Sequence, residues 1–306
     1  MKIITWNING YRSITGQNPS KRYDKINNEN KLFDFIKNSN PDIICLQETK
    51  ANIEQISEEL RFPKDFSGEY FSAQRKGYSG VATFVKQNNN MEGRMQYAPT
   101  KPQFNDRRGV LHTPCNNTPC KDESNHQNGF GIEKFDAEGR VIATHFSDFS
   151  LLNVYFPNGK KDEIRLQYKL DFYKSLFDYA EKLRKTQPNI IICGDYNTAH
   201  KPIDLARPKE NEKISGFLPI EREKLDKICS LGYVDAFRIF NKEAEQYSWW
   251  SNLGQARARN VGWRIDYFFV TENLVPQIKN CYLEPTVFGS DHCPVVLELQ
   301  LAPLSF

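Results

Sequence analysis

The chain has 306 residues with 41 basic and 38 acidic side chains, so a net charge of +3 gives no indication of a nucleic-acid partner by itself. Its hydrophobic content of 39% is enough for a large core, and we expect one domain over residues 1–306. No apolar run has the length of a bilayer span, no signal segment is evident, and the seven cysteines suggest no disulfide framework. We therefore expect a soluble, intracellular protein with no membrane partner.

Stretches with a period of two alternate along the chain with stretches of helical period. The β-rich runs predict strands over residues 2–6, 42–47, 70–73, 81–85, 141–144, 151–154, 189–193, 267–270 and 295–297. Amphipathic spacing predicts helices near residues 31–36, 53–60, 163–185 and 221–230. One face of the longest helix is expected to carry Ile164, Tyr168, Phe172, Leu176 and Tyr179. Residues 88–129 lose this periodicity, and we expect a surface excursion there.

Polar side chains lie where several of the predicted strands meet loops. They are Asn7, Glu48, Asp195 with Asn197, Asp266, and Asp291 with His292. If the two halves of the chain form two sheets that pack face to face with helices outside, these strand ends share one cleft. Carboxylate, amide and imidazole groups gathered in a cleft can hold a hard cation, position a water molecule and donate to a phosphate.

The motifs around these residues resemble those of a known family. They are Leu46–Lys50 (LQETK), Lys76–Ala82 (KGYSGVA), Tyr155–Gly159 (YFPNG), Gly194–His200 (GDYNTAH), Ile203–Lys209 (IDLARPK), Asn260–Asp266 (NVGWRID) and Gly289–His292 (GSDH). In this order they resemble the exonuclease III-type apurinic/apyrimidinic (AP) endonucleases of the deoxyribonuclease I-like phosphodiesterase superfamily. The resemblance covers residue 1 to about residue 301, apart from insertions near residues 13–29 and 88–128.

The resemblance implies both a fold and a reaction. The fold is a four-layered α/β sandwich of two packed mixed sheets flanked by helices. The reaction is Mg²⁺-dependent cleavage of double-stranded DNA on the 5′ side of an abasic site, with Mn²⁺ as a substitute metal and with 3′–5′ exonuclease or 3′-phosphodiesterase activity. The partner is then DNA that contains abasic sites. The protein is expected to be a monomer, in the cytoplasm of a prokaryote or the nucleus of a eukaryote.

The catalytic roles follow residue by residue from the resemblance. Asp195 corresponds to the general base, and Asn197, two positions on, points the same way on an extended segment and can aim the water or a phosphate oxygen. His292 would hydrogen-bond or protonate the phosphate, while Asp266 fixes its tautomer. Tyr155 corresponds to a phosphate-contacting tyrosine. From the residues alone, a turn aspartate and a buried structural tyrosine remain open readings.

The expected metal ligands are Glu48, supported by Asn7, with Asp291 as a further candidate. From the residues alone, Glu48 is equally a surface acid. Asn9 stands where animal members of the family carry an acid, which argues against a second metal ligand on that segment.

DNA contacts are expected from basic and aromatic loops beside the catalytic stretches, although solvated charge and core tryptophan are the structural alternatives. The backbone candidates are Arg75, Lys76, Tyr78, Lys160, Asn211 and Arg257, with Arg264 in the same group of loops. Lys160 replaces an arginine that enters the DNA in animal members. The resemblance assigns Trp249, Trp263 and Ile265 to an apolar pocket that accepts a sugar without its base.

The 88–128 insertion contains His112, Cys115, Cys120 and His126, at spacings near those of small zinc-binding loops. Two interpretations stay open, a structural Zn²⁺ site and a surface loop with incidental cysteines, because the spacing is not that of a standard zinc finger.

Two other functions compete with DNA cleavage. A superfamily relative could act on phospholipids or inositol phosphates, but the stretch 260–263 and the basic loops favour DNA. A catalytically silent DNA-binding module is disfavoured, because all the predicted catalytic side chains are present.

Overall fold

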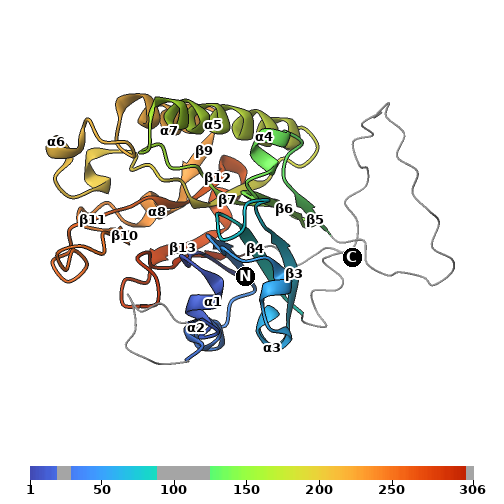
Figure 1. Cartoon of the computed structure of the whole chain (residues 1–306). Coiled ribbons are helices and arrows are strands. Elements are labelled where there is room, and N and C mark those ends of the chain that lie inside the picture. The colour runs from blue at the N-terminus through green and yellow to red at the C-terminus, as the bar shows by residue number, and fades with distance from the viewer. Residues whose placement is uncertain (19–28, 88–124, 301–306) are drawn as a thin grey trace.

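The computed structural model describes residues 1–18, 29–87 and 125–300, and within them two six-stranded sheets dominate (Figure 1). The first sheet has the order β13-β14-β1-β2-β4-β3. Its strands are β1 (Lys2–Asn7), β2 (Ile43–Gln47), β3 (Phe66–Phe71), β4 (Val81–Lys86), β13 (Ile278–Leu283) and β14 (Val295–Leu299). The sheet is mixed, because β1 and β2 are parallel whereas their other neighbours are antiparallel.

The second sheet repeats this design with the order β5-β6-β7-β8-β12-β9. Its strands are β5 (His126–Asn128), β6 (Val141–His145), β7 (Ser150–Tyr155), β8 (Ile190–Asp195), β9 (Tyr233–Asp235) and β12 (Asp266–Thr271). Here β7 and β8 form the parallel pair, flanked by antiparallel neighbours. A separate two-stranded ribbon pairs β10 (Trp249–Trp250) with β11 (Gly262–Trp263).

Helices cover the two outer faces (Figure 1). On the second sheet lie α4 (Glu133–Asp136), α5 (Glu163–Arg184) and α7 (Pro219–Ser230), and near the first lie α1 (Tyr11–Ile14), α2 (Lys31–Ser39) and α3 (Glu58–Arg61). The remaining helices are α6 (Pro208–Asn211), α8 (Ala236–Phe240) and the 3₁₀ segments η1 (Ile53–Gln55), η3 (Pro202–Asp204) and η4 (Glu272–Gln277). None of the described helices combines the length and apolarity that a bilayer crossing requires.

The alternation of strand side chains divides the core into layers. Ile3 and Ile191 belong to a buried cluster built from both sheets, whereas the next residues, Ile4 and Ile192, belong to separate clusters on the outer faces. Since successive strand residues point to opposite faces, strands buried on both sides bring one side chain to the partner sheet and the next to a helix. The predicted four-layered sandwich is therefore confirmed.

Some predicted elements differ from those found. The helix expected over residues 53–60 is split into η1 and α3, because Ile56 between them is extended (φ −103°, ψ 127°) and buried. The strand expected over residues 70–73 ends at Phe71. On α5 the expectation for Ile164 is wrong, since its side chain is 83% exposed, five residues before the first buried position at Lys169.

Two expectations about insertions are only partly within the described residues. Residues 13 and 14, assigned to the first insertion, belong to α1. Of the candidate zinc ligands, His112, Cys115 and Cys120 lie outside the described residues. His126 lies in β5, with its Nδ1 2.9 Å from Thr144 Oγ1, and burial lowers its pKa to about 4.

Candidate active site

Three of the predicted catalytic residues lie side by side at one edge of the second sheet. In the register of β7, β8 and β12, Asp195 is paired with Tyr155 on one side and with Asp266 on the other. All three side chains are buried. The register of these three strands fixes the spacing of the row.

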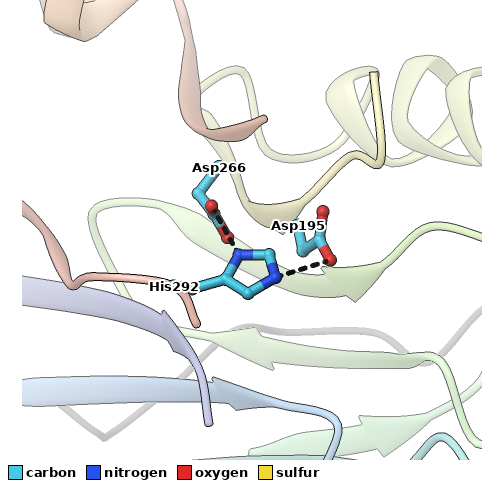
Figure 2. Close-up of side chains that lie close together, drawn as sticks. All are labelled: Asp195, Asp266 and His292. Atoms are coloured by element: carbon cyan, nitrogen blue, oxygen red, sulfur yellow. Dashed lines mark hydrogen bonds and ion pairs between the residues drawn. The ribbon is translucent and has the colours of Figure 1, made fainter. Parts of the chain in front are cut away.

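His292 approaches this row from the loop before β14 (Figure 2). Its Nδ1 lies 2.9 Å from Asp266 Oδ2, and the same oxygen accepts a 2.6 Å hydrogen bond from Ser248 Oγ. The carboxylate cannot donate, so Nδ1 carries the proton and Nε2 faces Asp195. Asp266 thus orients the imidazole, and Ser248 holds Asp266.

Asp195 is held from both sheets. Oδ2 accepts a hydrogen bond from Asn7 Nδ2 at 2.9 Å, and Oδ1 accepts one from the backbone N–H of Asn197 at 2.7 Å. Burial raises the pKa of Asp195 to about 7, and the charge of His292 limits the rise. A carboxylate whose pKa is near neutrality can both accept and release a proton under ordinary conditions.

The two central groups are close without touching. His292 Nε2 lies 3.9 Å from Asp195 Oδ2, which is longer than a direct hydrogen bond (Figure 2). Burial lowers the pKa of His292, but the carboxylates of Asp266, Asp195 and Asp291 outweigh it and raise that pKa to about 10. The His292 imidazolium and the Asp195 carboxylate can therefore both hydrogen-bond to a third group that lies between them, such as a phosphate oxygen or a water molecule.

Asp195, Asp266 and His292 also form the acid and histidine cluster, among the described residues, whose ligand atoms lie within 4.8 Å of one another. Such a cluster could bind a metal ion. Asp195 Oδ2 accepts from Asn7, and Asp266 Oδ2 accepts from Ser248 and lies 2.9 Å from the imidazole Nδ1, whereas Asp266 Oδ1 is buried without a hydrogen-bond partner.

A second group of donors surrounds Glu48, directly after β2. Glu48 has a left-handed backbone (φ 54°), and its carboxylate accepts a short hydrogen bond from Tyr155 Oη and an ion pair from Lys50 Nζ at 2.5 Å. The Lys50 ammonium also contacts Asn9 Oδ1. The Lys50 ammonium thus lies between the Glu48 carboxylate and the Asn9 amide oxygen. Oxygen atoms that hold a positive charge in this way are suitable ligands for a hard cation such as Mg²⁺.

Asp291 connects this group to the aromatic loop. Its Oδ1 accepts from Asn9 Nδ2 at 2.9 Å, and its Oδ2 accepts from the indole Nε1 of Trp249 at 3.2 Å. Asn7, the other predicted metal-supporting residue, is buried and accepts from the backbone N–H of Asn9 at 3.0 Å while its Nδ2 faces Asp195. Asn7 therefore contacts Asp195 on one side and Asn9, beside Glu48 and Lys50, on the other.

The predicted pocket residues form one apolar cluster. Trp249 and Trp263 face each other across β10 and β11, with ring centroids 6.3 Å apart at 86°, and Ile265 packs beside them. Lys160 Nζ lies 5.3 Å from the centroid of Trp249 and 5.9 Å from that of Trp263. An ammonium over two indole faces is a cation–π arrangement, and it places a positive charge beside the aromatic pair.

The residues predicted to bind the DNA backbone differ in their exposure and in their hydrogen bonds within the protein. Arg75 and Lys76 are exposed in the turn between β3 and β4. Tyr78 Oη accepts a hydrogen bond from the Arg165 guanidinium at 2.7 Å. Asn211 Nδ2 donates to the carbonyl oxygen of Arg207, the residue that precedes α6, at 2.9 Å.

Two arginines are tied into the protein. Arg257 lies over Trp250 and donates to three backbone carbonyl oxygens, those of Ser290, Pro285 and Val287. Arg264 is 1% exposed and bonds the carboxylates of Asp204 and Asp235, so the expectation that it meets a DNA phosphate is wrong. Its charge compensates buried acids.

Two charged residues beside the site, Arg140 and Lys169, were not predicted from the sequence. Arg140 is buried behind Tyr155, with its guanidinium 4.6 Å from the centroid of that ring and Nη1 2.9 Å from its carbonyl oxygen. Lys169 on α5 is fully buried and donates to the Asn197 carbonyl oxygen. Charged residues are expected at the surface, so neither Arg140, just before β6, nor Lys169 in α5 gives a sequence signal of burial.

Comparisons with known proteins agree with this arrangement. Residues 4–292 match the model of the "Endonuclease/Exonuclease/phosphatase family". The chain is 36% identical over 302 residues to an exodeoxyribonuclease of Bacillus subtilis (strain 168), covering 98% of this chain and all of that protein. It is 35% identical to a DNA-(apurinic or apyrimidinic site) endonuclease of Dictyostelium discoideum, covering 98% and 71% of the two chains.

A solved structure is similar over the same length. The AP endonuclease from Leishmania major superposes with a TM-score of 0.78 at 28% identity, covering 98% of this chain and 88% of that one. The strand-end carboxylates, the imidazole and the match over nearly the whole length lead to one conclusion: the chain belongs to the endonuclease/exonuclease/phosphatase family.

Proposed function

We propose that this protein is a DNA repair hydrolase that cleaves the phosphodiester on the 5′ side of an abasic site in double-stranded DNA and leaves a 3′-hydroxyl and a 5′-deoxyribose phosphate. The observation that carries the proposal is the junction at Asp291 and Trp249. Asp291 accepts a 3.2 Å hydrogen bond from Trp249, whose ring lies beside His292. Asp291 also contacts Asn9, which is linked through Lys50 to Glu48, so the expected metal ligands adjoin the aromatic pair. The names of the relatives, an AP endonuclease and an exodeoxyribonuclease, support the same substrate class.

The chain's own residues divide the work of hydrolysis. Asp195 takes the proton of the attacking water, and Asn197 holds the loop beside it. His292, charged and oriented by Asp266, donates from Nε2 to an oxygen of the scissile phosphate. Tyr155 Oη would donate to the phosphate once its bond to Glu48 is exchanged. Together these groups stabilise charge that grows on the phosphate in the transition state.

We propose Mg²⁺ as the metal, with Mn²⁺ as a substitute. Glu48 would hold it, with Asp291 and the amide of Asn7 nearby, because carboxylate and amide oxygens suit a hard cation. When bound, the ion would supply positive charge to the phosphate and to the leaving 3′ oxygen, which takes its proton from solvent water to become the 3′-hydroxyl.

The aromatic pair supplies selectivity. Trp249, Trp263 and Ile265 form an apolar cluster beside the acid–base pair, and a small apolar pocket can admit a sugar that has lost its base while excluding an intact nucleotide. Lys160 over the rings adds a positive charge for the neighbouring DNA backbone.

A second activity uses the same groups. The relative from Bacillus subtilis is named an exodeoxyribonuclease, and none of Asp195, His292 and Glu48 requires DNA to continue on both sides of the cleaved bond. We therefore include 3′–5′ exonuclease or 3′-phosphodiesterase activity. We also propose that the chain acts as a single-domain monomer, which sedimentation of the free protein would test.

The test is incision of a labelled duplex with one abasic analogue, beside the undamaged duplex, with Mg²⁺ or with EDTA. We expect incision on the 5′ side of the lesion, only with metal, and its loss in the variant His292→Asn. The matched control is His200→Asn, because His200 also bonds an aspartate but is not a member of the Asp195, Asp266 and His292 cluster. Binding without cleavage would favour a silent DNA-binding module. Hydrolysis of an inositol phosphate or phospholipid in place of DNA would favour the lipid-directed alternative.

A further inference from the structure

A lysine and a glutamate are completely buried behind the site. Lys169 on α5 and Glu221 on α7 are both 0% exposed, and Lys169 Nζ lies 2.7 Å from Glu221 Oε1. Removing two charges from water is costly, and the attraction between them repays the cost only when further hydrogen bonds satisfy both groups. Neither side chain has a part in the proposed reaction, so the partners of the pair indicate its role.

Each member of the pair holds a segment that borders the site. Lys169 Nζ donates to the carbonyl oxygen of Asn197 at 2.7 Å. Glu221 accepts three hydrogen bonds from residues 215–218, here called the 215–218 loop: from Ser215 Oγ at 2.9 Å and from the N–H groups of Gly216 at 2.6 Å and Leu218 at 3.1 Å. The pair therefore joins two helices to two loop segments.

The first segment contains Asn197, which needs such support. Its backbone is left-handed (φ 51°), a conformation that a residue with a Cβ rarely adopts, so the expectation of an extended segment from Asp195 to Asn197 is wrong. On one side its N–H holds Asp195 Oδ1, and its Nδ2 donates to the Phe156 carbonyl oxygen at 2.9 Å. The bond from Lys169 fixes the carbonyl on the other side. A shift of Asn197 would move the hydrogen bond that orients Asp195.

The second segment, the 215–218 loop, backs the aromatic pair. Gly216 has φ 101°, and a Cβ placed on it would lie 3.0 Å from Trp263 Cζ3, so the backbone lies directly against the indole. The ring of Phe217 meets Trp263 edge to face, with centroids 6.4 Å apart. The Gly216 carbonyl also accepts from the N–H of Ala199 at 2.8 Å. The position of the loop thus sets the position of Trp263.

We infer that the buried Lys169–Glu221 pair is a positioning device, which aligns Asn197 and the wall of the aromatic pocket together and so determines the preference for abasic DNA. The inference rests on the proposed function. Its alternative is a pair that only fastens α5 to α7. The two roles predict different results when both charges are removed at once, because joint removal leaves no unpaired buried charge and therefore costs less stability than the loss of one partner.

The experiment compares Lys169→Met/Glu221→Gln, Lys169→Met and Lys169→Arg with the wild type. In the double variant no buried charge is left unpaired, yet Met cannot donate to the Asn197 carbonyl. We expect the double variant to keep more of the wild-type Tm than Lys169→Met does, because it leaves no buried charge unpaired, and we expect a fall of at least about tenfold in kcat/KM on abasic duplex, since small misplacements of catalytic groups cost that much or more. The fall should lie mainly in kcat, and the preference over undamaged duplex should decrease. Lys169→Arg keeps a charged donor and should restore most of the incision that Lys169→Met loses.

Two further measurements separate the possibilities. Lys174→Met is the matched control on the same helix, because Lys174 pairs with Asp178 on the exposed face, and it should incise like the wild type. Acrylamide quenching of tryptophan fluorescence should rise in the double variant as Trp263 loses its backing, whether or not DNA is cleaved.

Several outcomes would overturn the inference. They are wild-type incision and quenching in a folded double variant, an equal loss in Lys169→Arg and Lys169→Met, or a loss of incision that follows the loss of Tm across all variants. A wild-type protein that leaves abasic duplex intact would refute the proposed function instead, and the quenching comparison would still test the positioning of Trp263.

Discussion

Replacement of Asp266 by asparagine tests the charge of His292 directly. Asn keeps the shape of the side chain and an oxygen for the 2.6 Å hydrogen bond from Ser248, but it removes the negative charge 2.9 Å from His292 Nδ1. Asp266 is the foremost of the groups that raise the pKa of His292 against the effect of burial. The substitution therefore isolates one electrostatic effect at a buried position.

The size of the effect follows from the pKa. The pKa of His292 rises from 6.5 to about 10 in the folded protein. Since one pKa unit corresponds to about 1.4 kcal/mol, the folded protein favours the imidazolium over the neutral imidazole by ~5 kcal/mol. Without the charge of Asp266 the pKa of His292 should fall, because only Asp195 and Asp291 then oppose the effect of burial, and a smaller share of the variant is protonated at pH 8. A positioned proton donor contributes about a hundredfold or more to turnover. We expect at least that loss in kcat.

The raised pKa of His292 should also make the stability of the fold depend on pH. The folded pKa of His292 lies above its ordinary value, so the ion pair stabilises the fold fully below a pH of about 6.5. That contribution is lost as the pH rises through about 10. The difference in Tm between wild type and Asp266→Asn should therefore be largest in mild acid and vanish in strong base.

The assay is NMR titration of the imidazole signals together with turnover at pH 8. Asp226→Asn is the matched control, because Asp226 Oδ1 lies 2.9 Å from His200 Nε2 outside the site, and this variant should change neither the His292 titration nor kcat. If His292 titrates in Asp266→Asn as it does in the wild type, Asp266 is not the source of the raised pKa. Unchanged turnover would remove Asp266 from catalysis.

Four further variants have defined outcomes. Asp195→Asn should lower kcat at least about a hundredfold with little loss of DNA affinity, because the amide cannot take a proton; equal turnover would remove the general base. Glu48→Gln should raise the Mg²⁺ concentration for half-maximal activity, since the carboxylate loses its charge, and an unchanged metal titration would contradict the ligand role. Trp263→Ala should lower the preference for abasic over intact duplex more than it lowers DNA binding, and equal losses on both would contradict the pocket. In Asp204→Asn the loss of Tm should be full above pH ~4 and disappear in stronger acid, because burial opposes but Arg264 holds the pKa of Asp204 below its usual range; a pH-independent difference would refute this.

Much of the secondary structure was predictable from local patterns. Alternating or continuous apolar residues gave β1, β2, β4 and β8 nearly at their bounds, and the longest amphipathic stretch gave α5 within one residue. The misses have a common cause. The break at Ile56 and the exposure of Ile164 depend on what lies across the chain from each residue, and periodicity within one segment carries no information about that neighbour.

By itself the sequence determined which groups stand at the ends of strands, and the order of its motifs identified the family. Strand ends are local, because a buried apolar run followed by Asn, Glu or Asp marks its own boundary. The functional roles of Asn7, Glu48 and Asp195 remain predictions, since geometry describes where they lie and only variants test what they do.

Tertiary structure alone decided the partners. Asn7 and Asp195 bond across 188 positions of sequence, Asn9 and Asp291 across 282, and Lys169 reaches Asn197 from a helix behind the sheet. It also decided that Arg264 is buried, although its loop reads as a basic surface. Such contacts form only when the two sheets and their helices pack together. A buried charge is stable only beside an opposite charge or hydrogen-bond partner, and the packing determines which residue that is. A pattern of neighbours along the chain holds no record of that partner.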